Sequence, residues 1–132
     1  MRKIIGIGET ILDILFKNNQ AATSVPGGST FNSMISLGRV GVPSCFLSEI
    51  GDDKVGKIVR TFLIDNGVDD RYLTEYPECK SPISLAFLDD HNNATYSFYK
   101  DSFGSRTDWQ CPTVDRDDII LFGSYYALDP NM

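Results

Sequence analysis

Short apolar runs recur along the chain and predict buried β-strands. They cover residues 3–7, 44–50 and 118–122. In the last run Ile119, Ile120, Leu121 and Phe122 follow one another without polar alternation, which is typical of a strand buried on both faces of a parallel sheet. We therefore expect these three runs to form strands.

Two other segments carry apolar residues at helical spacing. The first predicted helix has Ser29 or Thr30 as its N-cap and ends at Gly41; the second is capped by an aspartate of the pair 52–53 and ends at Gly67. Their apolar faces are Phe31, Met34, Ile35 and Gly38 in the first helix, and Val55, Ile58, Val59, Phe62 and Leu63 in the second. Strands alternating with helices predict an α/β fold with a parallel, Rossmann-like sheet.

Residues 12–25 and 80–101 follow strand patterns that do not fit this sheet. The first segment lacks helical spacing and is interrupted by Asn18 and Asn19, which predicts a hairpin or two short strands. In the second segment, apolar and polar residues alternate on both sides of the turn-rich segment 89–93. This alternation predicts an antiparallel hairpin with one apolar face, formed by Ile83, Leu85, Phe87, Tyr96 and Phe98. We expect both segments to form a small β lid.

Composition and charge narrow the class of protein. The chain has 132 residues, 42% of them apolar and 23% charged, which suits one soluble globular domain. A net charge of −6 without a basic stripe argues against nucleic acid as a partner. We expect no membrane partner, because no apolar stretch reaches the roughly 20 residues that span a bilayer. Glu9 and Asp13 interrupt the apolar run after the basic start, which argues against a signal peptide.

The three cysteines are Cys45, Cys79 and Cys111, an odd number at irregular spacing. They predict neither a disulfide framework nor, without clustered histidines, a zinc site. We expect no metal ligands in this chain, packing roles or no role for the cysteines, and a reducing, cytoplasmic setting.

Two glycine motifs imitate nucleotide-binding loops. Residues 51–57 match the spacing of a phosphate-binding P-loop, but Ile58 stands where that loop needs a serine or threonine, and two aspartates would face the phosphates. Gly6 and Gly8 begin a dinucleotide fingerprint that lacks its third glycine. We interpret both motifs as structural.

A third set of segments carries chemistry suited to a sugar. Residues 9–13 follow the first strand, and residues 27–32 open the first helix. In an open α/β sheet, such segments converge beyond the carboxyl ends of the strands. Asp13 can accept hydrogen bonds from vicinal hydroxyls, Asn32 can donate and accept, and Gly27 and Gly28 let a ligand approach the backbone. This combination predicts a site for a polyhydroxylated small molecule.

These segments are similar to the ribokinase family of carbohydrate kinases, also called the PfkB family, over essentially the whole chain. Residues 27–34 together with 37–41 resemble the family's N-terminal signature. The motif Gly51-x-Asp53-x-x-Gly56 falls where the family has it, and residues 97–100 resemble the end of the family's lid hairpin.

The resemblance implies a substrate pocket. Asp13, Gly27, Gly28 and Asn32 would hold sugar hydroxyls. Tyr96, Phe98 and Lys100 would line the lid side. Many members have arginine at the position of Lys100. The lysine keeps the positive charge but lacks the planar guanidinium group, which can form two parallel hydrogen bonds.

The resemblance also implies ATP-dependent phosphorylation of a sugar or sugar acid of the fructose, ribose or 2-keto-3-deoxygluconate type. The family's Gly-Ala-Gly-Asp signature, which supplies the catalytic base and anion hole, has no match here. We therefore expect residues 1–132 to be the N-terminal, substrate-binding part without the nucleotide-binding half. The chain would have no catalytic residue and no kinase activity by itself, and ATP and Mg²⁺ would belong to the full-length parent.

Other interpretations stay open. A non-catalytic sugar-binding or interaction module is the alternative from another class, and a nucleoside kinase is the alternative within the class. Asp13 could cap a turn, and Tyr96 and Phe98 could form lid core or a dimer contact. We also expect the strand at 118–122 to become a hydrophobic edge if the rest of the sheet is missing, so a homodimer could form there or through the lid.

Overall fold

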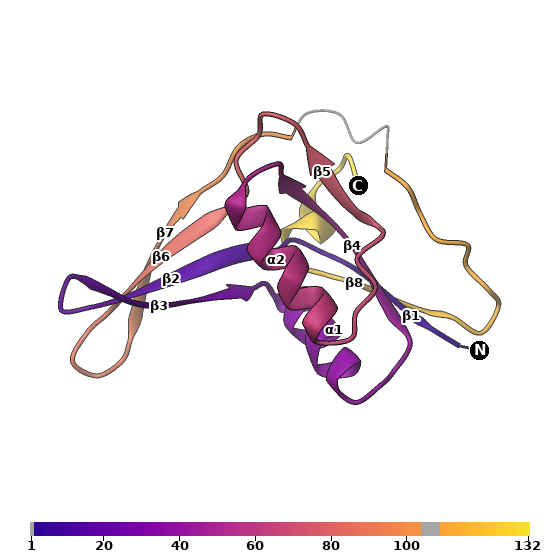
Figure 1. Cartoon of the computed structure of the whole chain (residues 1–132), viewed down its shortest axis with the longest axis horizontal. Coiled ribbons are helices and arrows are strands. Elements are labelled where there is room, and N and C mark those ends of the chain that lie inside the picture. Colours follow the sequence, from indigo (N-terminus) through magenta and orange to yellow (C-terminus); the bar gives the residue numbers. More distant parts are fainter. Residues whose placement is uncertain (1, 104–108) are drawn as a thin grey trace.

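A four-stranded parallel sheet forms one half of the molecule (Figure 1). The computed structural model describes residues 2–103 and 109–132. The strand order is β5-β4-β1-β8, and every neighbouring pair is parallel. The bounds are Ile4–Ile7 for β1, Ser44–Gly51 for β4, Leu73–Tyr76 for β5 and Ile119–Phe122 for β8. The three strands predicted from apolar runs are confirmed, whereas β5 was missed because it is short and half polar.

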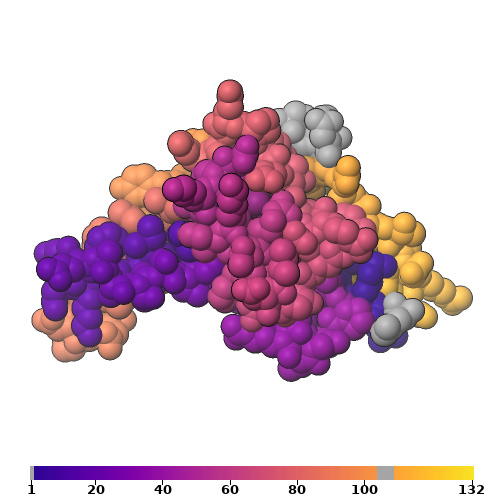
Figure 2. Space-filling model, in the orientation of Figure 1, coloured from indigo at the N-terminus to yellow at the C-terminus, as the bar shows by residue number. Residues whose placement is uncertain are grey.

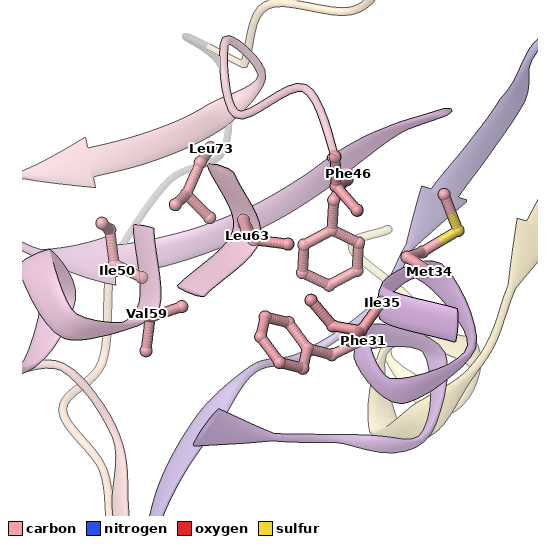
Figure 3. Close-up of a cluster of buried hydrophobic side chains, with 9 residues drawn as sticks. Phe31, Met34, Ile35, Phe46, Ile50, Val59, Leu63 and Leu73 are labelled. Atoms are coloured by element: carbon pink, nitrogen blue, oxygen red, sulfur yellow. The ribbon is translucent and has the colours of Figure 1, made fainter. Parts of the chain in front are cut away.

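Both helices cover one face of this sheet, α1 spanning Ser29–Arg39 and α2 spanning Lys54–Asp65 (Figure 1). Figure 3 shows how Phe31 from α1 and Leu63 from α2 surround Phe46 of β4. The rings of Phe31 and Phe46 meet edge to face, with centroids 5.6 Å apart. No helix in the described part of the chain has the length and apolar character needed to cross a membrane.

The helix predictions are confirmed in position and partly wrong in detail. All four predicted core residues of α1 are buried. In α2, Val59 and Leu63 are buried, but Ile58 is 45% exposed. The face of α2 that meets the sheet is centred on Val59, and the adjacent residue in sequence turns about 100° away from it.

The two helices also begin differently. Asp53 caps α2 as expected, since its Oδ1 accepts a hydrogen bond of 2.8 Å from the backbone N–H of Gly56. The N-cap of α1 is Gly28, with φ of 126° and no side-chain cap, so the expected capping by Ser29 or Thr30 is wrong. Thr30 is instead buried within the first turn.

A second four-stranded sheet, with order β3-β2-β6-β7, forms the lid. Its strands are β2 (Ile11–Lys17), β3 (Gln20–Gly27), β6 (Ile83–Leu88) and β7 (Ala94–Tyr99). Two antiparallel hairpins join through a parallel β2–β6 pair. Asn18 and Asn19 both have positive φ, which a tight two-residue hairpin turn requires. The two hairpin tips project together away from the helices (Figures 1 and 2).

The lid hairpin does not have the single apolar face that alternation predicted. Tyr96 pairs with Ala86 and Phe98 pairs with Ser84, so both rings lie on the face opposite Leu85. Ser84 and Ala86 are buried, whereas the predicted inward residues on β6 are half-buried or exposed. Cross-strand register, which the spacing within either strand does not reveal, makes both faces partly apolar.

Strand β8 pairs with β1 along its whole length, and side-chain contacts reinforce its beginning. The Nζ of Lys3 donates a 2.6 Å hydrogen bond to Asp118, which also accepts from the backbone N–H of Lys3 at 2.9 Å. These contacts, led by the Lys3 side chain, lower the pKa of Asp118 to about 2. β8 is an edge strand, as expected for this chain alone, and Ile120 and Phe122 are 54% and 46% exposed.

Candidate functional site

A cavity of about 630 Å³ lies between the parallel sheet and the lid. Segments just beyond the carboxyl ends of β1 and β8 contribute Glu9 and Ser124, and the last part of β4 contributes Glu49. From the lid come Phe98, in β7, and Lys100, just after it. Ligands of open α/β sheets bind at this edge because the strand ends and the following loops converge there.

An ion pair joins the two sheets at this cavity. The Nζ of Lys100 donates to Glu9 Oε2 at 3.2 Å. The same ammonium lies 5.8 Å from the ring centre of Phe98 and 5.3 Å from that of Tyr125. Lys100 is therefore engaged by a carboxylate and two aromatic rings at once.

A buried hydroxyl–carboxylate pair forms another part of the wall. The hydroxyl of Tyr126 donates to Glu49 Oε1 at 2.8 Å, and both residues are at most 5% exposed. Burial, followed by the charge of Glu49, raises the pKa of Tyr126 well above its ordinary value. Tyr126 therefore remains a neutral hydrogen-bond donor and acceptor at physiological pH.

The beginning of α1 approaches Glu9 closely through its glycine cap. A Cβ placed on Gly28 would lie 2.4 Å from the backbone oxygen of Glu9, and its φ of 126° disfavours any other residue. Gly28 and Ser29 both line the cavity. Glycine at this position lets the segment after β1 and the start of α1 lie in direct contact along the cavity wall.

The structure brings three of the seven predicted site residues together at this cavity: Gly28, Phe98 and Lys100. Asp13 and Gly27 form a neighbouring pair, since the Asp13 carboxylate accepts from the hydroxyl of Ser84 and lies 2.7 Å from where a Gly27 Cβ would stand.

The last two predicted residues, Asn32 and Tyr96, lie outside the lining of the cavity. Asn32 is exposed in the first turn of α1. Tyr96 is stacked on Phe98 with ring centres 5.9 Å apart and is 54% exposed. Neither residue lines the cavity as the structure describes it.

The residues at the P-loop-like motif do not fit nucleotide phosphates. Asp53 caps α2, and its carboxylate accepts from the hydroxyl and the backbone N–H of Ser81 at 2.6 and 2.8 Å. Desolvation raises the pKa of Asp53, but the hydrogen bonds from Ser81 and Gly56 outweigh it and leave the pKa lowered. A carboxylate occupies the helix N-terminus where a phosphate would have to bind, which agrees with a structural role for this motif.

Sequence reasoning missed three residues that shape the cavity. Glu49 carried a usable signal, because a carboxylate near the end of an otherwise buried strand needs a partner or a ligand. Tyr125 and Tyr126 carried none. They belong to a short 3-10 helix, Ser124–Leu128, whose position depends on the pairing of β8 with β1.

Comparison with known proteins shows the family of the chain. Residues 1–124 match the model of the pfkB family carbohydrate kinases. The chain belongs to this family. Its relatives include a fructokinase of Rhizobium leguminosarum bv. trifolii, 32% identical over 124 residues, and a fructokinase of Escherichia coli, 27% identical over 113 residues. The matches cover 88% and 83% of this chain, but only 35% and 37% of those relatives.

Solved structures show the same fold. A putative ribokinase from Agrobacterium tumefaciens superposes with a TM-score of 0.71 at 18% identity, over 84% of this chain and 40% of that one. A fructokinase with bound ATP from Xylella fastidiosa gives a TM-score of 0.64 at 23% identity, over 76% of this chain and 34% of that one. This pfkB-family chain thus spans little more than a third of the proteins it matches, and its fold is the ribokinase-like α/β fold with a lid.

Proposed function

We propose that this chain is the sugar-binding part of an ATP-dependent carbohydrate kinase, and that the cavity between the parallel sheet and the lid receives the sugar. The observation that carries the proposal is the convergence of Gly28, Glu9 and Lys100 on one cavity from three separate segments. Membership of the pfkB family and the fructokinases among the relatives support a sugar as the ligand.

The chemistry of the wall suits a polyhydroxylated ligand. Glu9, Glu49 and the hydroxyl of Tyr126 offer hydrogen-bonding groups, while Phe98 and Phe103 offer apolar surface for the C–H faces of a sugar ring. Asp13, Gly27 and Tyr96 lie in the lid strands β2, β3 and β7, so closure of the lid would bring them nearer to the ligand. Asn32 lies in α1 and is proposed to contact the ligand from the side of the parallel sheet.

Phosphoryl transfer is assigned to the complete kinase rather than to these residues. ATP and Mg²⁺ would be bound by parts of the relatives that this chain does not match. Purified chain is expected to show no sugar-dependent ATP turnover in a coupled assay. Turnover that a point mutation in this chain abolishes would contradict this assignment.

Sugar binding itself can be followed through Trp109, the one tryptophan of the sequence. Its ring lies 6.0 Å from that of Tyr126, which lines the cavity, so a bound sugar should change its fluorescence. We expect saturable changes with fructose, ribose or a keto sugar acid, confirmed by saturation-transfer NMR.

Two substitutions test where the sugar binds. Phe98→Ala should weaken binding at least about fivefold, because it removes a wall of the cavity. Phe87→Ala, on the opposite face of the lid, is the matched control and should leave the affinity unchanged. Asp13→Asn should weaken binding by about one to two decades if Asp13 holds hydroxyls. No binding of any of these sugars would contradict the proposed function.

A further inference from the structure

We propose that the cavity selects neutral sugars over anionic ones, and that Glu9 sets this selectivity by neutralising Lys100. The inference rests on the proposed sugar-binding function and narrows it to one class of sugar. Sugar acids and phosphorylated sugars would be disfavoured, although both carry the hydroxyl groups that the cavity can bind.

Among the described residues, acidic side chains outnumber basic ones on the cavity wall. Among the lining residues that the structure describes, the charged ones are Glu9, Glu49, Asp101, Asp129 and Lys100. The net charge of −6 on the whole chain has the same sign. An anionic ligand would therefore meet the carboxylates of Glu9 and Asp101, and water screens Glu9 only in part because its side chain is 27% exposed.

The positive charge of Lys100 does not compensate these negative charges for an incoming anion. Its ammonium already pairs with Glu9 at 3.2 Å and lies against the rings of Phe98 and Tyr125. A ligand carboxylate would have to displace Glu9 and leave that carboxylate without its cation. A neutral hydroxyl can donate to Glu9 without breaking the ion pair.

The backbone of Glu9 is held from two sides. Its N–H donates to the hydroxyl of Ser124 at 2.9 Å, and its carbonyl oxygen lies against Gly28. These contacts place Glu9 at the junction of β1, α1 and the segment after β8. Glu9 is therefore a positioned partner of Lys100, and the structure assigns it the role of a specificity-determining residue.

A pair of sugars that differ at one carbon provides the test. D-Fructose and 2-keto-D-gluconate share the remaining carbons and configuration, but carbon 1 is a hydroxymethyl group in the first and a carboxylate in the second. Calorimetric titration of the full chain should give fructose an affinity at least about tenfold higher. Glu9→Gln should narrow this ratio to about threefold or less, because the ammonium of Lys100 becomes available to the carboxylate.

Two further variants control this result. Asp90→Asn removes one negative charge from the exposed turn between β6 and β7, outside the cavity, and should leave the ratio unchanged. Glu9→Gln combined with Lys100→Met should lose the affinity for 2-keto-D-gluconate that Glu9→Gln gained. Circular dichroism and thermal unfolding confirm that each variant is folded.

The outcomes separate this inference from the function on which it rests. If wild-type chain binds 2-keto-D-gluconate as tightly as fructose, the selectivity is wrong and the sugar-binding function stands. If a folded Glu9→Gln variant keeps the wild-type ratio, the role of Glu9 is wrong. If neither sugar binds, the inference is overturned, and the proposed function is overturned with it if ribose does not bind either.

Discussion

Strands β4 and β8 flank β1 on opposite sides, yet their burial is the reverse of what their sequences indicate. β4 contains Ser44, Ser48 and Glu49, but all eight of its residues are buried. β8 consists only of apolar residues, but three of its four are exposed. The difference lies in what surrounds each strand, because β4 has β1 and β5 as neighbours and both helices over one face.

This comparison teaches that an apolar run predicts a strand but does not predict which other elements bury that strand. The second face of β4 carries Cys45 and Leu47, which together with Ile5 are covered by Tyr72 and Trp109. The outer side of β8 has no strand partner within the described residues. Packing energy should therefore be concentrated in β4, and the following predictions test that expectation.

The largest expected effect is on the core of β4. Phe46 is fully buried, so Phe46→Ala should lower the free energy of unfolding by about 3–5 kcal/mol. Phe122→Ala in β8 is the matched control and should cost about 1 kcal/mol or less. Urea denaturation followed by circular dichroism measures both. Equal losses in the two variants would show that β8 is packed as tightly as β4.

A smaller effect is expected where β4 leads into α2. Asp53→Ala removes the cap of α2 and the acceptor for Ser81, and should cost about 1–2 kcal/mol in the same assay. Asp52→Ala, at the exposed neighbouring aspartate, should change the free energy of unfolding little. An Asp53→Ala variant that is as stable as the wild type would show that Asp53 does not stabilise α2 as its cap.

At the start of β8, the expected effect depends on pH. The pKa of Asp118 is lowered from 3.8 to about 2, so its ion pair stabilises the fold above about pH 4 and this contribution is lost as pH falls toward 2. Asp118→Asn should therefore lower the urea midpoint at about pH 6 but not at about pH 2.

The exposed Asp117→Asn variant provides the baseline at each pH. If Asp118→Asn lowers the urea midpoint by the same amount at both pH values, the ion pair with Lys3 is not the source of the lost stability.

The smallest effect on stability is expected at the exposed face of β8. Ile120→Lys should leave the free energy of unfolding within about 0.5 kcal/mol of wild type, but should reduce self-association of the chain, because a charge protects a sheet edge. Light scattering coupled to size exclusion measures the oligomeric state. Val40→Lys places the same charge on another exposed apolar residue, which is 76% exposed.

Association that Ile120→Lys and Val40→Lys leave unchanged would exclude the β8 edge as the contact. The lid, where a homodimer was the other expectation, would then be the surface to test.

Part of the candidate site could be predicted from local sequence. Gly28 was predicted from a glycine pair before a helix, and its positive φ is a local backbone requirement. Phe98 and Lys100 were predicted from the resemblance of the lid hairpin to the family. Glu49 and Tyr126 were missed, because their 2.8 Å contact joins segments 77 residues apart.

The sequence by itself determined the local elements of this protein: the apolar strands, the two amphipathic helices, an aspartate cap within 52–53 and a chain interruption at Asn18 and Asn19. These depend on spacing and backbone preference within a few residues, which a sequence contains directly. Only the tertiary structure decided which face of the lid hairpin is buried, why β4 is buried despite its polar residues whereas the apolar β8 is exposed, and that Glu9 pairs with Lys100. Each of these depends on register or contact between distant segments, and the free energy of such contacts belongs to both partners together.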